Sequence, residues 1–133
     1  AFGSDLGRDA GPFESNLNRF VDINKDFLGK KALLNRKIEV SCVTLLIDGP
    51  EDMDPWGREA LYNESEELML GRLTSGGHSV HFKKSIGIGY VKSSFSEVGT
   101  KLRIKMDNMF WDAEIVQDSP YDPKNEKIIN RTY

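Results

Sequence analysis

The alternation of apolar and polar residues is clearest near the end of the chain. Lys101–Met106 and Met109–Val116 alternate with a period of two, and Asp107-Asn108 between them is a favoured two-residue hairpin turn. Residues two apart lie on one face of a strand. We therefore predict a β-hairpin with one face toward the core, formed by Leu102, Ile104, Met106, Met109, Trp111, Ala113 and Ile115. The other face of the return strand carries Phe110, Asp112 and Glu114.

Four further segments have the character of strands. Val40–Asp48 is a continuous apolar and β-branched run, long enough to cross a core. Arg58–Tyr62 and Glu67–Leu73 flank a polar turn and predict a second hairpin, and Ser85–Lys92 predicts one more strand. The turns are spaced as in small antiparallel barrels and sandwiches. The pattern predicts a mainly β fold, a small antiparallel six-stranded barrel or sandwich.

One short helix is expected before these strands. Lys25–Lys37 places Leu28, Ala32 and Leu33 on one helical face, with basic residues on the other. Asp26 is the candidate N-cap, but Gly29 disfavours helix, so we expect the helix to begin near Gly29. The preceding NRFVDIN alternates like a short strand.

Composition narrows the class of protein. The chain has 133 residues, enough for one domain, and a net charge of −3, which argues against a general nucleic-acid binder. No apolar run approaches the ~20 residues that cross a bilayer. The lone Cys42 cannot form an internal disulfide. Because the chain begins AFGSDLG, without an initiator methionine, we expect it to be a piece of a longer protein.

A glycine-rich stretch, GRLTSGGHSVHFKKSIGIGYV at 71–91, could be read as a phosphate cradle. A dinucleotide fingerprint needs its glycines between a strand and a helix, so that the helix N-terminus meets the pyrophosphate. Gly87 and Gly89 instead lie inside an expected strand, and no helix follows. The pattern therefore argues against a nucleotide cofactor at this stretch.

The same stretch contains candidates for catalysis or metal binding. Ser75 and His78 could form a nucleophilic pair, but no carboxylate is placed to orient His78. His78 and His81 lack the third ligand of a good metal site. We therefore expect no catalytic residue and no metal site, and we interpret TSGG as a structural bend that allows a close approach to a ligand or another domain.

Three ordered blocks resemble one known family. They are GPFESNLNRFVDINKDFLGKKALL at 11–34, the glycine-rich stretch at 71–91, and SPYDPKNEKI at 119–128. Together they resemble the C-terminal barrel of the aminomethyltransferase (glycine cleavage T-protein) superfamily. The resemblance is greatest to the barrels of sarcosine dehydrogenase, dimethylglycine dehydrogenase and the regulatory subunit of pyruvate dehydrogenase phosphatase.

The resemblance implies a folate-linked domain. Residues 1–25 would be the tail of a preceding folate-binding subdomain, and residues 26–133 the C-terminal barrel that closes one wall of the tetrahydrofolate cavity. FAD would bind elsewhere in the parent protein, so the chain alone should be inert. The preceding subdomains are then its partners, and no nucleic acid or membrane is expected. The location would be the mitochondrial matrix in a eukaryote or the cytoplasm in a bacterium.

The resemblance also suggests cofactor-binding residues: Arg19, Phe20, Ser75 and Gly76. Arg19 stands where folate-binding relatives usually carry an aromatic residue, and Glu14-Ser15-Asn16 replaces the usual E-A-G. These departures also suit a non-catalytic regulatory or scaffold protein of the same architecture. An unrelated β-barrel interaction module is a third possibility.

Overall fold

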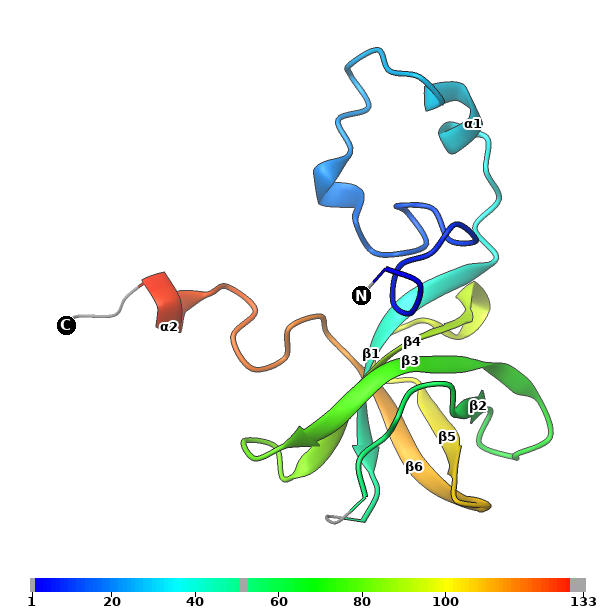
Figure 1. Ribbon diagram of the computed structural model, residues 1–133, viewed down its shortest axis with the longest axis vertical. Coiled ribbons are helices and arrows are strands. Elements are labelled where there is room, and N and C mark those ends of the chain that lie inside the picture. The colour runs from blue at the N-terminus through cyan, green and yellow to red at the C-terminus, as the bar shows by residue number, and fades with distance from the viewer. Residues whose placement is uncertain (1, 51–52, 130–133) are drawn as a thin grey trace.

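A computed structural model of the chain describes residues 2–50 and 53–129. Over these residues six antiparallel strands close into a barrel in the order β1-β4-β3-β2-β5-β6, with β6 paired to β1 (Figure 1). The predicted mainly β fold is confirmed, as a barrel rather than a sandwich. The elements are η1 (Asn18–Phe20), α1 (Lys30–Leu34), β1 (Val40–Asp48), β2 (Ala60–Tyr62), β3 (Met69–Ser79), β4 (Lys84–Lys92), η2 (Ser93–Phe95), β5 (Lys101–Met106), β6 (Met109–Val116) and α2 (Glu126–Ile129).

The β5–β6 hairpin has the predicted ends. Met106 pairs with Met109, and the two residues between them, Asp107 and Asn108, have φ values of 45° and 60°. Two consecutive positive φ values define the turn type whose twist matches the flanking strands. The local sequence therefore determines the register of this hairpin.

The barrel interior is filled by alternate residues of the strands. The buried apolar side chains are Val43, Leu45, Ile47, Leu61, Leu70, Leu73, Val91, Leu102, Ile104, Met106, Ala113 and Ile115. The predicted inward face of β6 is confirmed at Ala113 and Ile115, and Trp111 is partly buried against the core. Met109 was predicted to face the core but is 52% exposed. It follows the hairpin turn directly, where the strand has passed the end of the barrel.

The expected bend at TSGG is wrong. These residues continue β3, which runs to Ser79 and pairs with β4 through Gly76↔Gly87 and His78↔Ser85. A shift of register between Leu73 and Ser75 marks a β-bulge, which absorbs the irregularity without ending the strand. The chain reverses after Ser79, and Lys83 takes a positive φ there.

The first forty residues differ most from expectation. NRFVDIN is not a strand, because Asn18–Phe20 forms a 3-10 turn with local hydrogen bonds and no partner strand. The helix does begin beside Gly29, but Gly29 itself is the N-cap, with φ 89°, so the Asp26 cap is wrong. Of the predicted apolar face, Leu28 lies before the helix and is fully exposed, Ala32 is exposed, and Leu33 alone is partly buried.

Residues 17–39, here called the arm, arch away from the barrel, and the C-terminal segment after β6 leaves on another side (Figure 1). The N-terminal loop, residues 2–10, lies between the arm and the barrel. In the segment that follows this loop, the carbonyl of Glu14 accepts a 2.6 Å hydrogen bond from the backbone N–H of Cys42, at the start of β1. The arm is therefore anchored at its base and exposed along its length.

Candidate functional site

Arg19 and Phe20 form an exposed stacked pair on the arm. The Arg19 guanidinium carbon lies 4.8 Å from the centroid of the Phe20 ring, and Phe20 is 69% exposed. A cation over an aromatic face is a favourable arrangement. The pair offers a surface on which a planar heterocycle can stack.

Ser75 is held by the N-terminal loop. Its hydroxyl donates to Oδ1 of Asp5 at 2.8 Å, and the Thr74 hydroxyl donates to the same oxygen at 2.8 Å. The Tyr90 hydroxyl donates to the Asp5 backbone carbonyl, and Ser4 donates to the carbonyl of Thr74, both at 2.8 Å. Asp5 thus joins strands β3 and β4 to the segment that precedes the arm.

Gly76 contacts a different part of the chain. A side chain at this position would meet Cβ of Pro55 at 2.9 Å and the carbonyl oxygen of Ile86 at 3.1 Å. Ser75 and Gly76 therefore contact different segments: Ser75 meets the N-terminal loop and Gly76 the β1–β2 loop. Among the described residues no hydrogen bond or ring contact joins either residue to Arg19 or Phe20, so the structure brings the predicted site residues together only in two pairs.

The glycine pair of β4 serves the packing of the barrel. A Cβ at Gly87 would lie 2.6 Å from Cδ1 of Leu73 and 3.1 Å from Cδ1 of Ile47, and one at Gly89 would lie 2.6 Å from the Arg72 carbonyl oxygen. Contacts this short require atoms to move. The G-x-G pattern is thus explained by strand approach and core packing.

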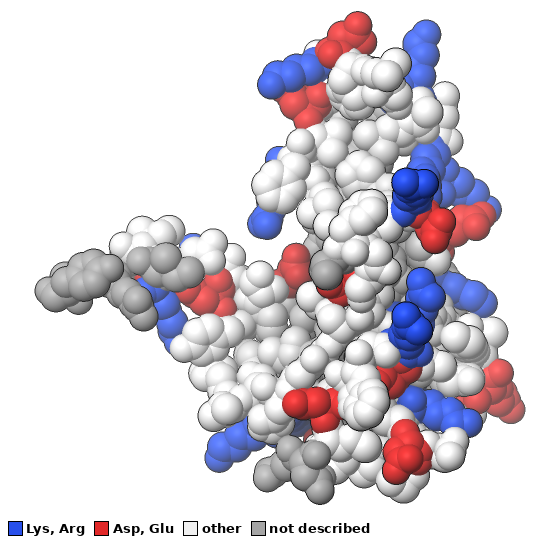
Figure 2. Space-filling view, in the orientation of Figure 1, with Lys and Arg blue, Asp and Glu red and all other residues white. Residues whose placement is uncertain are grey.

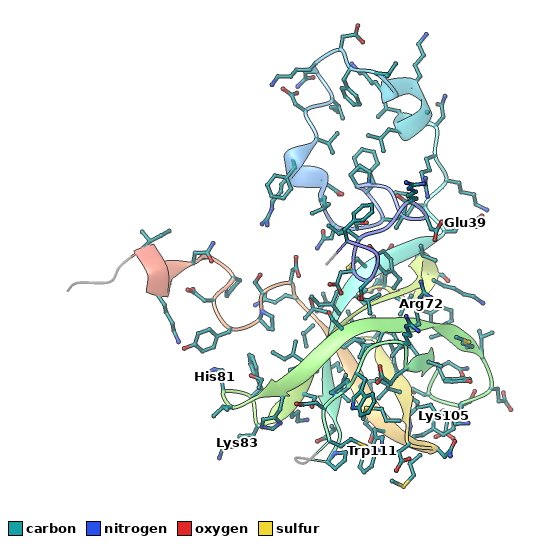
Figure 3. All side chains as sticks on the ribbon, in the orientation of Figure 1. Glu39, Arg72, His81, Lys83, Lys105 and Trp111 are labelled. Carbon is teal, nitrogen blue, oxygen red and sulfur yellow. The ribbon has the colours of Figure 1, made fainter. Side chains whose placement is uncertain are left out.

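The two histidines are separated along the β3–β4 hairpin. His78 pairs with Ser85 within the strands. His81 lies at the tip, near Lys83 (Figure 3), and its ring meets those of Phe82 and Tyr121 edge to face at 4.9 and 4.4 Å. Across residues 2–50 and 53–129, no three His, Cys, Asp or Glu side chains converge as a metal ion requires.

Glu14 is a buried charged residue that the sequence patterns did not single out. Its side chain is 3% exposed, and the Arg36 Nε donates to its Oε1. Arg36 also donates through Nη2 to the backbone carbonyl of Asp9. Glu14 lies in the first motif block, at 11–34, so the block itself was the available signal. The pair joins the segment that precedes the arm to the part of the arm that returns to β1.

The backbone of Cys42 is hydrogen-bonded to that of Glu14, and its thiol has low reactivity. Burial, and then the negative charges of Asp118 and Asp5, raise the pKa of the Cys42 thiol to about 11. At neutral pH the thiol is therefore protonated, and the thiolate is the reactive form.

We expect Cys42 to react with iodoacetamide at pH 8 on the order of a hundredfold more slowly in the folded chain than in urea, because a pKa two units higher leaves that much less thiolate. Quenched alkylation followed by mass spectrometry measures both rates. Equal rates would contradict the protected thiol.

No helix among the described residues is both long and apolar enough to cross a membrane. Charged side chains are spread over both the arm and the barrel, with lysines and arginines at the outer edges of the arm (Figure 2). This distribution of charge does not by itself indicate a ligand.

Comparison with known proteins supplies the family. The family described as glycine cleavage T-protein C-terminal barrel domain matches residues 41–122. Mouse mitochondrial dimethylglycine dehydrogenase is 34% identical over 125 residues, covering 89% of this chain and 14% of that protein. The aminomethyltransferase of Natranaerobius thermophilus is 32% identical, covering 90% of this chain and 33% of that protein.

A solved structure shares the fold. The aminomethyltransferase T of the glycine cleavage system from Bartonella henselae superposes with a TM-score of 0.77 at 21% identity, covering 90% of this chain and 34% of that one. The chain thus spans between 14% and 34% of the length of these relatives. An unrelated β-barrel interaction module is excluded, and the chain belongs to the glycine cleavage T-protein C-terminal barrel domain family.

Proposed function

We propose that this chain is the C-terminal domain of a folate-linked N-methyl amine demethylase or aminomethyltransferase and that it closes one wall of a tetrahydrofolate cavity. Its 34% sequence identity to mouse dimethylglycine dehydrogenase, over 89% of this chain, supports this class. The exposed Arg19–Phe20 pair is the observation that carries the cavity role. Residues 1–25 would then belong to the preceding folate-binding subdomain and residues 26–133 to the barrel.

Two separate pairs of residues would contribute to the wall of a folate site. The exposed Arg19–Phe20 pair would stack on the pterin ring, and the exposed Gly76 would contact a second part of the ligand. The Ser75 hydroxyl would contact the ligand only after its hydrogen bond to Asp5 breaks. When bound, tetrahydrofolate would accept the one-carbon unit released from the amine. The FAD of a dehydrogenase parent would lie outside this chain.

The exposed apolar residues of the arm support a docking role toward the preceding subdomains. Phe20, Ile23, Leu28, Leu34 and Ile38 are exposed, and a hollow of about 910 Å³ runs beside Phe27, Leu28 and Leu34. Exposed apolar surface of this kind is typical of interfaces between domains. A parent enzyme would place this domain in the mitochondrial matrix of a eukaryote or in a bacterial cytoplasm.

In the full-length parent protein, we expect Arg19→Ala to weaken tetrahydrofolate binding about tenfold, because the stacked guanidinium is lost. Lys92→Ala, an exposed cation on β4, is the matched control and should leave affinity unchanged. Isothermal titration calorimetry measures both. Gly76→Val is a poorer test, because its side chain would also strike Pro55.

A non-catalytic regulatory or scaffold protein of the same architecture is the alternative. The engagement of the Thr74 and Ser75 hydroxyls by Asp5 favours it, because two polar groups are then unavailable to a ligand. Unchanged folate affinity in Arg19→Ala would support this alternative and remove the site role from the arm.

A further inference from the structure

A cavity of about 400 Å³ opens between residues 53–59 of the β1–β2 loop and the β5–β6 hairpin. The β1–β2 loop and the turn of this hairpin lie at the end of the barrel away from the arm (Figure 1). None of the proposed folate residues lines the cavity. Its lining residues are Met53, Asp54, Trp56, Glu59, Lys105, Met106 and Asp107. Apolar and acidic side chains therefore share one hollow.

Trp56 is the most unusual residue of this cavity, because it is 90% exposed. Tryptophan has a large apolar surface, and it is enriched among the residues that dominate binding between proteins. Met53 and Met106 add apolar surface to the same cavity. The combination is typical of a contact surface.

The loop that carries Trp56 is held in place. The backbone N–H of Trp56 donates to Oε1 of Glu59 at 2.7 Å. Gly57 has a φ of 86°, and a Cβ there would lie 2.5 Å from the carbonyl oxygen of Thr74 on β3. Arg58 has a φ of 88°, which residues other than glycine rarely adopt. A loop fixed in this way loses little conformational entropy when a partner binds.

The charged groups that line the cavity are mostly acidic. Asp54, Glu59 and Asp107 contribute three carboxylates, against the ammonium group of Lys105. That ammonium group lies 5.6 Å from the centroid of the Phe110 ring, which does not line the cavity. Oε2 of Glu59 is buried and has no hydrogen-bond partner within the described part of the chain. The surface therefore complements a positively charged group.

A guanidinium group matches both properties of this surface. It is planar and stacks on aromatic rings, and its N–H donors pair with carboxylate oxygens. An uncharged or acidic partner would leave the three carboxylates without a counter-charge. We propose that the cavity and Trp56 form a docking surface for another protein, which places an arginine side chain between the Trp56 indole and the acidic residues. This proposal does not depend on folate binding, since none of its residues belongs to the proposed folate wall.

The test is an NMR titration of the 133-residue chain with a glycine-arginine-glycine tripeptide blocked at both ends, at an ionic strength held constant with sodium chloride. We expect saturable shifts of the indole and backbone N–H of Trp56. The same peptide with citrulline in place of arginine keeps the shape without the charge and should not saturate. Lysine in place of arginine should bind more weakly. Citrulline binding equal to that of arginine, or tighter binding of lysine, would overturn the proposal.

Variants locate the binding at this cavity. Trp56→Leu should weaken binding of the arginine peptide about threefold or more, as expected for the loss of a cation–π contact. Because Trp56 is 90% exposed, this variant should fold. Glu59→Gln should weaken binding about tenfold, and glutamine keeps an oxygen that can accept from the Trp56 N–H.

Glu97→Gln is the matched control, since it removes the same charge from an exposed residue of the loop after η2. It should bind the peptide like the unchanged chain. An unaltered affinity in either Trp56→Leu or Glu59→Gln would contradict the proposed docking surface.

A second copy of this chain is the other occupant to test. Sedimentation velocity of the unchanged chain and of Trp56→Leu, at the concentration of the titration, separates the two cases. We expect both to be monomeric. A dimer of the unchanged chain that dissociates in Trp56→Leu would assign the surface to self-association and overturn the proposal.

Discussion

Gly71→Ala is expected to lower the free energy of unfolding by about 3 kcal/mol or more, the upper end of the cost of overpacking. A Cβ on Gly71 would lie 1.8 Å from the carbonyl oxygen of Tyr90 on the neighbouring strand, and 2.9 Å from Cα of Val91. Both obstacles are backbone atoms of β4, so relief requires the β3–β4 ladder to separate. Urea denaturation followed by circular dichroism measures the loss.

Gly77→Ala on the same strand is the matched control. A Cβ there meets nothing within 4 Å, and its φ is not positive. We expect no loss, or a gain of about 0.4–1 kcal/mol, because alanine reduces the entropy of the unfolded chain. If the two alanine variants had equal stability, the close approach of β3 and β4 at Gly71 would be wrong.

Arg36→Met should destabilise the packing of the arm base by about 3 kcal/mol, because it leaves the buried Glu14 carboxylate without its cation. Methionine keeps much of the apolar stem, so the charge is the main change. The backbone N–H of Cys42 donates to the Glu14 carbonyl, and its exchange with deuterium reports on this junction. We expect faster exchange at Cys42 together with the loss in urea stability.

Lys37→Met tests the same charge change at an exposed pair. Nζ of Lys37 lies 3.2 Å from Oε1 of Glu39, and both side chains are largely exposed, at 84% and 71%. Exposed pairs contribute roughly 0–1 kcal/mol, so little should change. If Arg36→Met were as mild as Lys37→Met, Glu14 would not depend on its partner.

The strands with strong local signals could be predicted from the sequence. Val40–Asp48 and the two strands flanking Asp107-Asn108 have the predicted ends, because side-chain alternation and a turn with two positive φ values are properties of neighbouring residues. Gly87 and Gly89 lie inside a strand, β4, as predicted. The ordered motif blocks also indicated the family.

Other features depend on contacts between distant residues, and only the tertiary structure decided them. Pairing of β6 with β1 distinguishes a barrel from a sandwich, and no local pattern specifies it. TSGG is a strand because its ladder with β4 outweighs the weak β preference of glycine. NRFVDIN alternates but has no partner strand, so it does not form one. Glu14 is buried because Arg36, distant in sequence, folds back onto it, and a single acidic residue carries no periodic signal of that burial.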